Sequence, residues 1–189
     1  MTSTPLQRLL TGSLLVAPVV YLIADVLYAT RGWDDPTAGV VHVLAAAGYT
    51  VVMIRLATLG DGPLAVALLL AGVLGAAGDV AYGFNTIHVS LGDTDLVDAS
   101  GAAVLIKPLG LCFPLTLLLG AVMLRHRVPA WAVALVAAGG LLWPVAHIAN
   151  LGWLAVLTNL LLTAAFGAAA VSLRQAAPFE VTRPVIENS

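Results

Sequence analysis

Apolar residues fill six long stretches of the chain, and short polar segments separate them. A helix that crosses a bilayer needs about 20 mostly apolar residues, and each stretch is long enough to span. The stretches cover residues 6–29, 38–59, 63–84, 101–124, 129–149 and 151–173. The pattern predicts an all-α integral membrane protein, a bundle of six transmembrane helices with short loops. Residues 1–175 form its single domain, and residues 176–189 form a short disordered tail.

Turn-forming residues separate most of these stretches. Segments 31–36 and 60–63 hold Gly, Asp and Pro, which end helices or start the next one. The weakest break is 150–152, where one long kinked helix is the alternative to two helices. The first stretch has no clear cleavage site after it, so we interpret it as a helix rather than a signal peptide.

Basic residues collect on one side of the predicted bundle. That side holds Arg8, Arg55, Arg125, Arg127, Arg174 and Arg183. The other side holds Arg31 with Asp34, Asp35, Asp93, Asp95 and Asp98. Because positively charged loops stay in the cytoplasm, the pattern predicts a multi-pass protein of the cell membrane with both termini inside.

Composition agrees with a lipid environment and excludes several classes of protein. Of the 189 residues, 60 % are hydrophobic and 10 % are charged, and the mean hydropathy is +1.00. Soluble domains carry about 25 % charged residues, so membrane lipids are the expected surroundings. A net charge of −2 gives no electrostatic case for nucleic acid. The single cysteine, Cys112, excludes an intramolecular disulfide.

Glycine and alanine are abundant in the third, fifth and sixth stretches. Small residues let helix backbones approach closely in lipid. Packing within the bundle explains them, and a homo-oligomer through the same faces is the alternative. The longest connection, 85–100, carries both apolar and acidic residues. It is interpreted either as a lid on the bundle or as a solvated acidic connector.

Each predicted helix carries one strongly polar side chain, in the half away from the basic side. Ionisable groups inside a bilayer are costly and are functional candidates by default. These residues are Asp25, His42, Asp79, Lys107, His147 and Asn159. The other half offers only hydroxyl groups and arginines that can reach the interface. The sequence therefore predicts a polar pocket that opens outward above an apolar plug.

Aromatic and amide side chains accompany these polar groups, because residues three or four apart share a helix face. The candidate substrate-binding residues are Tyr21, Tyr28, Tyr82, Asn85, Trp143, Asn150 and Asn159. Aromatic rings beside ionisable groups suit an unsaturated or cationic guest. The alternative is the aromatic belt that forms at any membrane interface.

The buried charges decide what the pocket can do. Two carboxylates, Asp25 and Asp79, face one ammonium, Lys107, which can neutralise one of them. The other carboxyl group pairs with a protonated histidine or takes up a proton, and can then act as a general acid. His42 and His147 are candidates for proton relay or for fixing an aspartate in place. The structural alternative is an Asp79–Lys107 salt bridge that locks two helices.

Metal and cofactor signals are absent from the sequence. It contains no HxxxH, HExxH or CxxCH pattern, and segment 93–98 lacks EF-hand spacing. The acidic loop residues are interpreted as solvated charges. We therefore predict no metal and no cofactor.

The leading hypothesis is a membrane-embedded enzyme that acts by acid–base chemistry on an isoprenoid-like or lipid-like small molecule. Cyclisation, isomerisation and hydrolysis all suit the residues. Asp79 is the candidate general acid or base, assisted by Asp25, Lys107, His42 and His147. Membrane terpene cyclases are similar in general architecture, an analogy that assigns no residue.

Two other classes of function stay open. One is a proton-coupled small-molecule transporter, and the other is a non-catalytic ligand-binding or assembly protein. The half of the bundle nearer the basic side has few polar side chains. This argues against the transporter, because alternating access needs a polar path on both sides of the membrane.

Overall fold

The computed structural model describes residues 4–175. The predicted disordered tail, 176–189, lies outside the described residues. Within the described part, the chain forms six α-helices and one 3-10 helix, η1, and no strand. The elements are α1 (Pro5–Arg31), α2 (Pro36–Ala57), α3 (Pro63–Ser90), η1 (Gly101–Leu105), α4 (Ile106–Leu124), α5 (Ala130–Ile148) and α6 (Gly152–Gln175). Six helices are long and apolar enough to cross a membrane, with η1 and α4 forming one of them.

Helix boundaries differ from the predicted ones by more than two residues at two places, and the structure also decides whether α5 and α6 are separate helices. α3 continues to Ser90 rather than ending at residue 84, because no glycine or proline intervenes before Gly92, whose φ is 89°. Residues 101–105 form a 3-10 turn rather than the first turn of α4. Asn150 has a φ of 53°, which breaks the chain between α5 and α6 and excludes one long kinked helix.

Local capping chemistry explains where the helices begin. The Thr4 hydroxyl accepts a hydrogen bond from the backbone N–H of Gln7 at 3.2 Å. The Gln7 side-chain oxygen accepts one from the backbone N–H of Thr4 at 3.0 Å. The Asp35 carboxylate accepts from the Ala38 amide at 2.8 Å. Proline follows the cap in both helices, where its missing N–H costs nothing. Strong caps of this kind allow the connection between α1 and α2 to be short.

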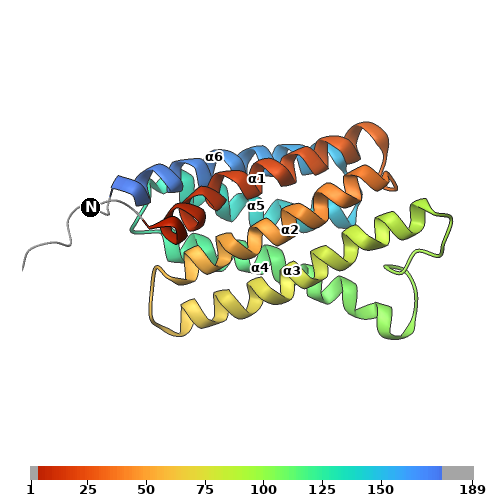
Figure 1. Ribbon diagram of the computed structural model, residues 1–189, viewed down its shortest axis with the longest axis horizontal. Helices are drawn as coiled ribbons and strands as arrows, with labels where there is room; N and C mark the ends of the chain where they lie inside the picture. The colour runs from red at the N-terminus through yellow and green to blue at the C-terminus, as the bar shows by residue number, and fades with distance from the viewer. Residues whose placement is uncertain (1–3, 176–189) are drawn as a thin grey trace, which may run out of the picture.

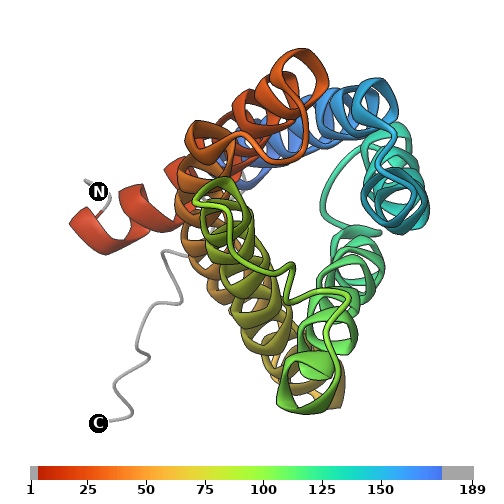
Figure 2. The ribbon, with the colours of Figure 1, turned by 90° about the vertical axis from the view of Figure 1, so that its right-hand side faces the viewer.

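The six helices form a closed ring in chain order. Each helix packs on its neighbours in sequence, and α6 packs on α1 to close the ring. Figure 1 shows the helices lying side by side along the long axis, and Figure 2 shows the ring from one end. Large side chains fill the middle of the bundle, among them Tyr49, Phe113, Leu117, Leu162 and Phe166.

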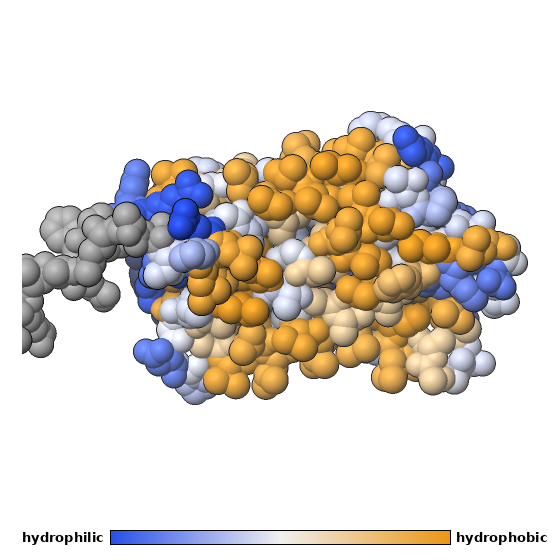
Figure 3. Space-filling view, viewed as in Figure 1, coloured by the Kyte–Doolittle hydropathy of each residue, from blue (hydrophilic) through white to orange (hydrophobic). Residues whose placement is uncertain are grey.

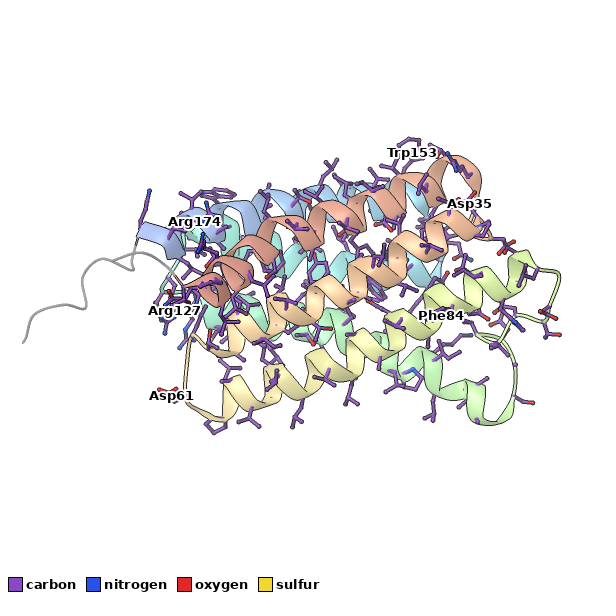
Figure 4. The ribbon with its side chains drawn as sticks, viewed as in Figure 1. Asp35, Asp61, Phe84, Arg127, Trp153 and Arg174 are labelled. Atoms are coloured by element: carbon purple, nitrogen blue, oxygen red, sulfur yellow. The ribbon has the colours of Figure 1, made fainter. Side chains whose placement is uncertain are left out.

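The surface has an apolar middle and two polar ends (Figure 3). Arg127, Arg174 and Asp61 lie at one end, which we call the basic end (Figure 4). The opposite end carries the α1–α2, α3–α4 and α5–α6 connections. Asp35 lies there, and so do the acidic residues of the α3–α4 connection, so we call it the acidic end. This distribution matches the expected separation of charges along the bundle.

Two glycines bring the backbones of α3 and α4 into contact. A Cβ atom at Gly78 would lie 2.2 Å from the Gly110 nitrogen, and one at Gly75 would lie 2.5 Å from the Phe113 nitrogen. No larger residue fits either position without moving a helix. These small residues therefore face a helix of the same chain. Their close crossing also sets the position of Asp79, the next residue along α3.

Candidate functional site

A cavity of about 310 Å³ lies at the acidic end, between α3, α4 and α5. Small-molecule sites in proteins start at about this size. The α3–α4 connection borders it through Asp95, Val97 and Asp98. Two of its apolar lining residues, Leu111 and Ile148, are also 45 % and 66 % exposed on the outside of the bundle. The cavity therefore reaches the apolar outer surface at α4 and α5.

Asp79 lines this cavity, and its buried carboxyl group lacks a hydrogen-bond partner for one oxygen. The residue is 1 % exposed, and its Oδ2 atom has no hydrogen-bond partner among the described residues. Two other lining side chains also carry an unpartnered polar atom, His42 at Nδ1 and Trp143 at Nε1. Buried polar atoms are normally hydrogen-bonded. Three such atoms belong to side chains that line this cavity, which makes it the candidate binding site for a polar ligand.

Asp25 lies behind the cavity wall and is fully buried. Its Oδ1 atom is 3.2 Å from Nε2 of His147, and Asn159 donates to its Oδ2 atom at 2.6 Å. The other ring nitrogen of His147 lies 3.0 Å from the Trp143 carbonyl oxygen. A carbonyl only accepts, so Nδ1 carries a hydrogen. With Nδ1 protonated, a hydrogen bond between Nε2 and Oδ1 requires one further proton, which the Asp25–His147 pair would share.

Aromatic side chains close the cavity toward the basic end. The Tyr21 hydroxyl lies 3.3 Å from Nε2 of His42. The Tyr21 ring stacks on Phe113 at 5.7 Å between centroids, and Tyr49 packs edge-on against Phe113 at 4.9 Å. All three rings are fully buried or nearly so. They form the upper layer of the apolar plug that the sequence predicts.

Lys107 does not meet either buried aspartate. Its ammonium binds Asp98 at 2.7 Å, and its side chain is 56 % exposed. The structural alternative, an Asp79–Lys107 salt bridge that locks two helices, is therefore wrong, and Lys107 does not neutralise either buried aspartate. The reason is the 3-10 turn before α4, which puts Lys107 in the first turn of the helix, at the mouth of the cavity. This leaves Asp79 without a protein cation.

The structure divides the predicted site residues into two layers. The residues that line the cavity are Asp79, His42, His147, Lys107, Tyr82, Asn85, Trp143 and Asn150. The residues that lie behind it are Asp25, Tyr21, Tyr28 and Asn159. The first three contact lining residues, and Asn159 binds Asp25. The cavity also takes in residues that the sequence reasoning did not select, among them Trp33, Gly78, Thr86, Asp95 and Asp98.

Trp33 is the largest of the residues that were missed. It stacks on Tyr28 at 4.8 Å, and its Nε1–H donates to the Asn150 carbonyl oxygen at 2.9 Å. It was not selected from the sequence, because tryptophan gathers at membrane interfaces without a binding role. Thr86, by contrast, follows Tyr82 by one helical turn and Asp79 by two, so it shares their helix face. The helical spacing would have found it.

The α3–α4 connection rests on the bundle through specific hydrogen bonds. Asn85, which is buried, donates to Oδ1 of Asp95 at 2.9 Å and accepts from the Leu96 amide at 2.8 Å. His88 lies 3.3 Å from Asp93, and Lys107 binds Asp98. The acidic residues of this segment are therefore held by α3 and α4. The contacts favour a cover over the cavity mouth rather than a free connector.

Replacing Asn85 with leucine is expected to release this cover. The change removes both hydrogen bonds to the connection, each of which contributes about 0.5–1.5 kcal/mol to local stability. Hydrogen exchange of the peptide that contains Leu96 should become about tenfold faster or more. Lys107→Gln is the matched control, because exposed ion pairs contribute about 0–1 kcal/mol. Equal exchange in both variants would show that Asn85 does not hold the segment.

The arrangement can bind a small molecule and exchange protons with it. Within residues 4–175, no three His, Cys, Asp or Glu side chains are grouped to hold a metal ion. The groups available for chemistry are the Asp79 carboxyl, the His42 imidazole and the shared proton of the Asp25–His147 pair. No family model, no curated protein and no solved structure matches this chain.

Proposed function

We propose that the chain is a multi-pass protein of the cell membrane and that all six apolar helices cross the bilayer. The apolar middle of the face shown in Figure 3 supports this, since it lies between two polar ends, and all six helices are long and apolar enough to span. We further propose that the basic end and both termini face the cytoplasm, because arginines concentrate there. The cavity would then open on the outer side and toward the outer leaflet.

We infer that the protein is an enzyme that acts on a lipophilic small molecule by acid–base chemistry. The observation that carries this is Asp79, a buried carboxyl group that lines the cavity and has no protein partner for Oδ2. Such a group is free to give a proton to a bound molecule or take one from it. A lipid-like or isoprenoid-like molecule, entering past Leu111 and Ile148, suits the apolar side of the cavity.

The other polar groups have supporting roles in this proposal. The Asp25–His147 pair holds a proton next to the cavity, and Asn159 fixes Asp25 in place. His42, positioned by the Tyr21 hydroxyl, presents its second ring nitrogen without a protein partner. Cyclisation, isomerisation or hydrolysis each need one group that gives a proton and one that takes it. Asp79 and His42 supply such a pair at one cavity.

The packing below the cavity favours an enzyme over a transporter. Tyr49, Phe113, Leu117 and Phe166 are at most 1 % exposed and fill the bundle between the cavity and the basic end. Alternating access would have to separate this layer. An enzyme that admits and releases its substrate from one side needs no such motion.

The test compares organic extracts of the protein purified in mild detergent. Mass spectrometry of the Asp79→Asn variant should reveal one lipophilic molecule at near-stoichiometric amount, the unreacted substrate, which wild type replaces with a molecule related by proton transfer, rearrangement or addition of water. Asp61→Asn, at the basic end, is the matched control and should resemble wild type. The same bound molecule in wild type and Asp79→Asn would contradict the catalytic role.

A further inference from the structure

The ionisable side chains that line the cavity are mostly acidic. Four carboxylates, those of Asp34, Asp79, Asp95 and Asp98, accompany a single ammonium, that of Lys107. Asp98 already binds Lys107, and Asp95 is held by Asn85 and by the Val97 amide. No other lysine or arginine lines the cavity. A guest therefore meets a negative surface, and the one deep carboxyl group, Asp79, has no cation of its own.

Aromatic rings surround the same space from three sides. The Trp143 ring stacks on His147 at 4.3 Å between centroids, and Trp33 packs edge-on against His147 at 5.8 Å. Across the cavity, Tyr82 lies 5.5 Å from His42. The faces of tryptophan and tyrosine attract cations, and more strongly where water is excluded. Acidic and aromatic groups thus favour the same kind of guest.

We propose that the molecule bound in this cavity is a lipophilic amine with a single positive charge. Its nitrogen pairs with the Asp79 carboxylate among the rings of Tyr82 and Trp143, and its apolar part extends toward Leu111 and Ile148. This inference rests on the proposed function and names its substrate class. Asp79 is then the group that binds the ammonium nitrogen and can take up its N–H proton, which leaves a neutral amine and a protonated carboxyl group.

The same groups discriminate against other lipophilic molecules. A carboxylate or phosphate guest would approach four carboxylates, and the Lys107 ammonium that might attract it lies at the mouth and is bound to Asp98. A neutral alcohol can donate one hydrogen bond to Asp79 and gains nothing from the negative surface. Hydrogen bonds that involve a charged group are about twice as strong as neutral ones, so the amine is preferred.

Binding of three probes to the protein in lipid nanodiscs tests this inference. The probes are octyldimethylamine, octanol and octanoate, which share one alkyl chain and differ in charge. Tryptophan fluorescence reports occupancy, because Trp33 and Trp143 line the cavity whereas Trp131 and Trp153 lie outside it and are exposed. We expect saturable binding of the amine, and binding of the alcohol and the carboxylate at least about tenfold weaker.

The Asp79→Asn variant separates binding at the site from partition into the lipid, since both proteins sit in the same bilayer. It should bind the amine at least about tenfold more weakly, whereas Asp61→Asn should bind it as wild type does. Octanol or octanoate binding as tightly as the amine to wild type would overturn the inference, and this comparison needs no variant. That result would leave the acid–base proposal standing, because the extract comparison tests that proposal without any assumption about charge.

Discussion

Gly78→Ala is expected to destabilise the bundle by about 3 kcal/mol, the upper part of the range for overpacked sites. The added methyl group would lie 2.2 Å from the Gly110 nitrogen and 2.4 Å from the Leu109 carbonyl carbon. Both neighbours are backbone atoms, so no side chain can move aside. α3 and α4 must separate, and the cavity that they border changes shape with them.

The measurement is the unfolding midpoint in mild detergent, followed by circular dichroism. Gly12→Ala is the matched control, because Gly12 also lies in a helix and a Cβ atom there meets nothing within 4 Å. That substitution should be neutral or stabilise α1 by up to about 1 kcal/mol through helix propensity. A Gly78→Ala midpoint equal to that of Gly12→Ala would show that the two helices are not in backbone contact.

Breaking the Asp25–His147 pair is expected to have the second large effect. Asp25→Ala leaves the His147 ring and the Asn159 amide buried without their acceptor, and His147→Ala leaves the carboxyl group without its main partner. Removing one member of a buried ion pair costs about 3–5 kcal/mol. The double variant removes both groups. Its decrease in the free energy of unfolding should be smaller than the sum of the two single decreases by about 1–3 kcal/mol.

A double-mutant cycle on the unfolding midpoints and slopes measures this coupling. Asn159→Ala extends it, since that change removes one donor to Asp25 and leaves the histidine in place, and it should cost less than either single change. Strictly additive losses for Asp25→Ala and His147→Ala would mean that the two side chains do not share a proton in the folded protein.

The helices were predictable because their signal is local. A stretch of about 20 apolar residues predicts a membrane-spanning helix without any knowledge of its tertiary contacts. All six stretches are helical in the structure. The errors lie at the ends. α3 runs past Phe84 to Ser90, and the Thr86 hydroxyl donates to the Tyr82 carbonyl oxygen within this last part of the helix. Hydropathy falls there although the helix continues.

The site was predictable only in part, because partners come from distant parts of the chain. Depth along each helix placed Asp79, His42 and His147 in the half of the bundle away from the basic side, and all three line the cavity. Which acid pairs with which base depends on helix rotation and on the order of helices around the ring. From the sequence, Lys107 was therefore the predicted partner of one aspartate. In the structure, His147 and Asn159 are the groups that bind Asp25.

The closure of the ring between α1 and α6 has a consequence for synthesis of the chain in the proposed membrane setting. Asp25 belongs to the first helix, but its partners lie 122 and 134 residues later. At roughly 5–20 residues per second, the ribosome makes α6 on the order of ten seconds after α1. During this delay the nascent bundle already contains the Asp25 carboxyl group but neither of its hydrogen-bond partners, His147 and Asn159. Until α5 and α6 are made, a bound proton can neutralise the Asp25 carboxyl group. The last two helices therefore complete both the ring and the set of groups that balance the charge of Asp25 in α1.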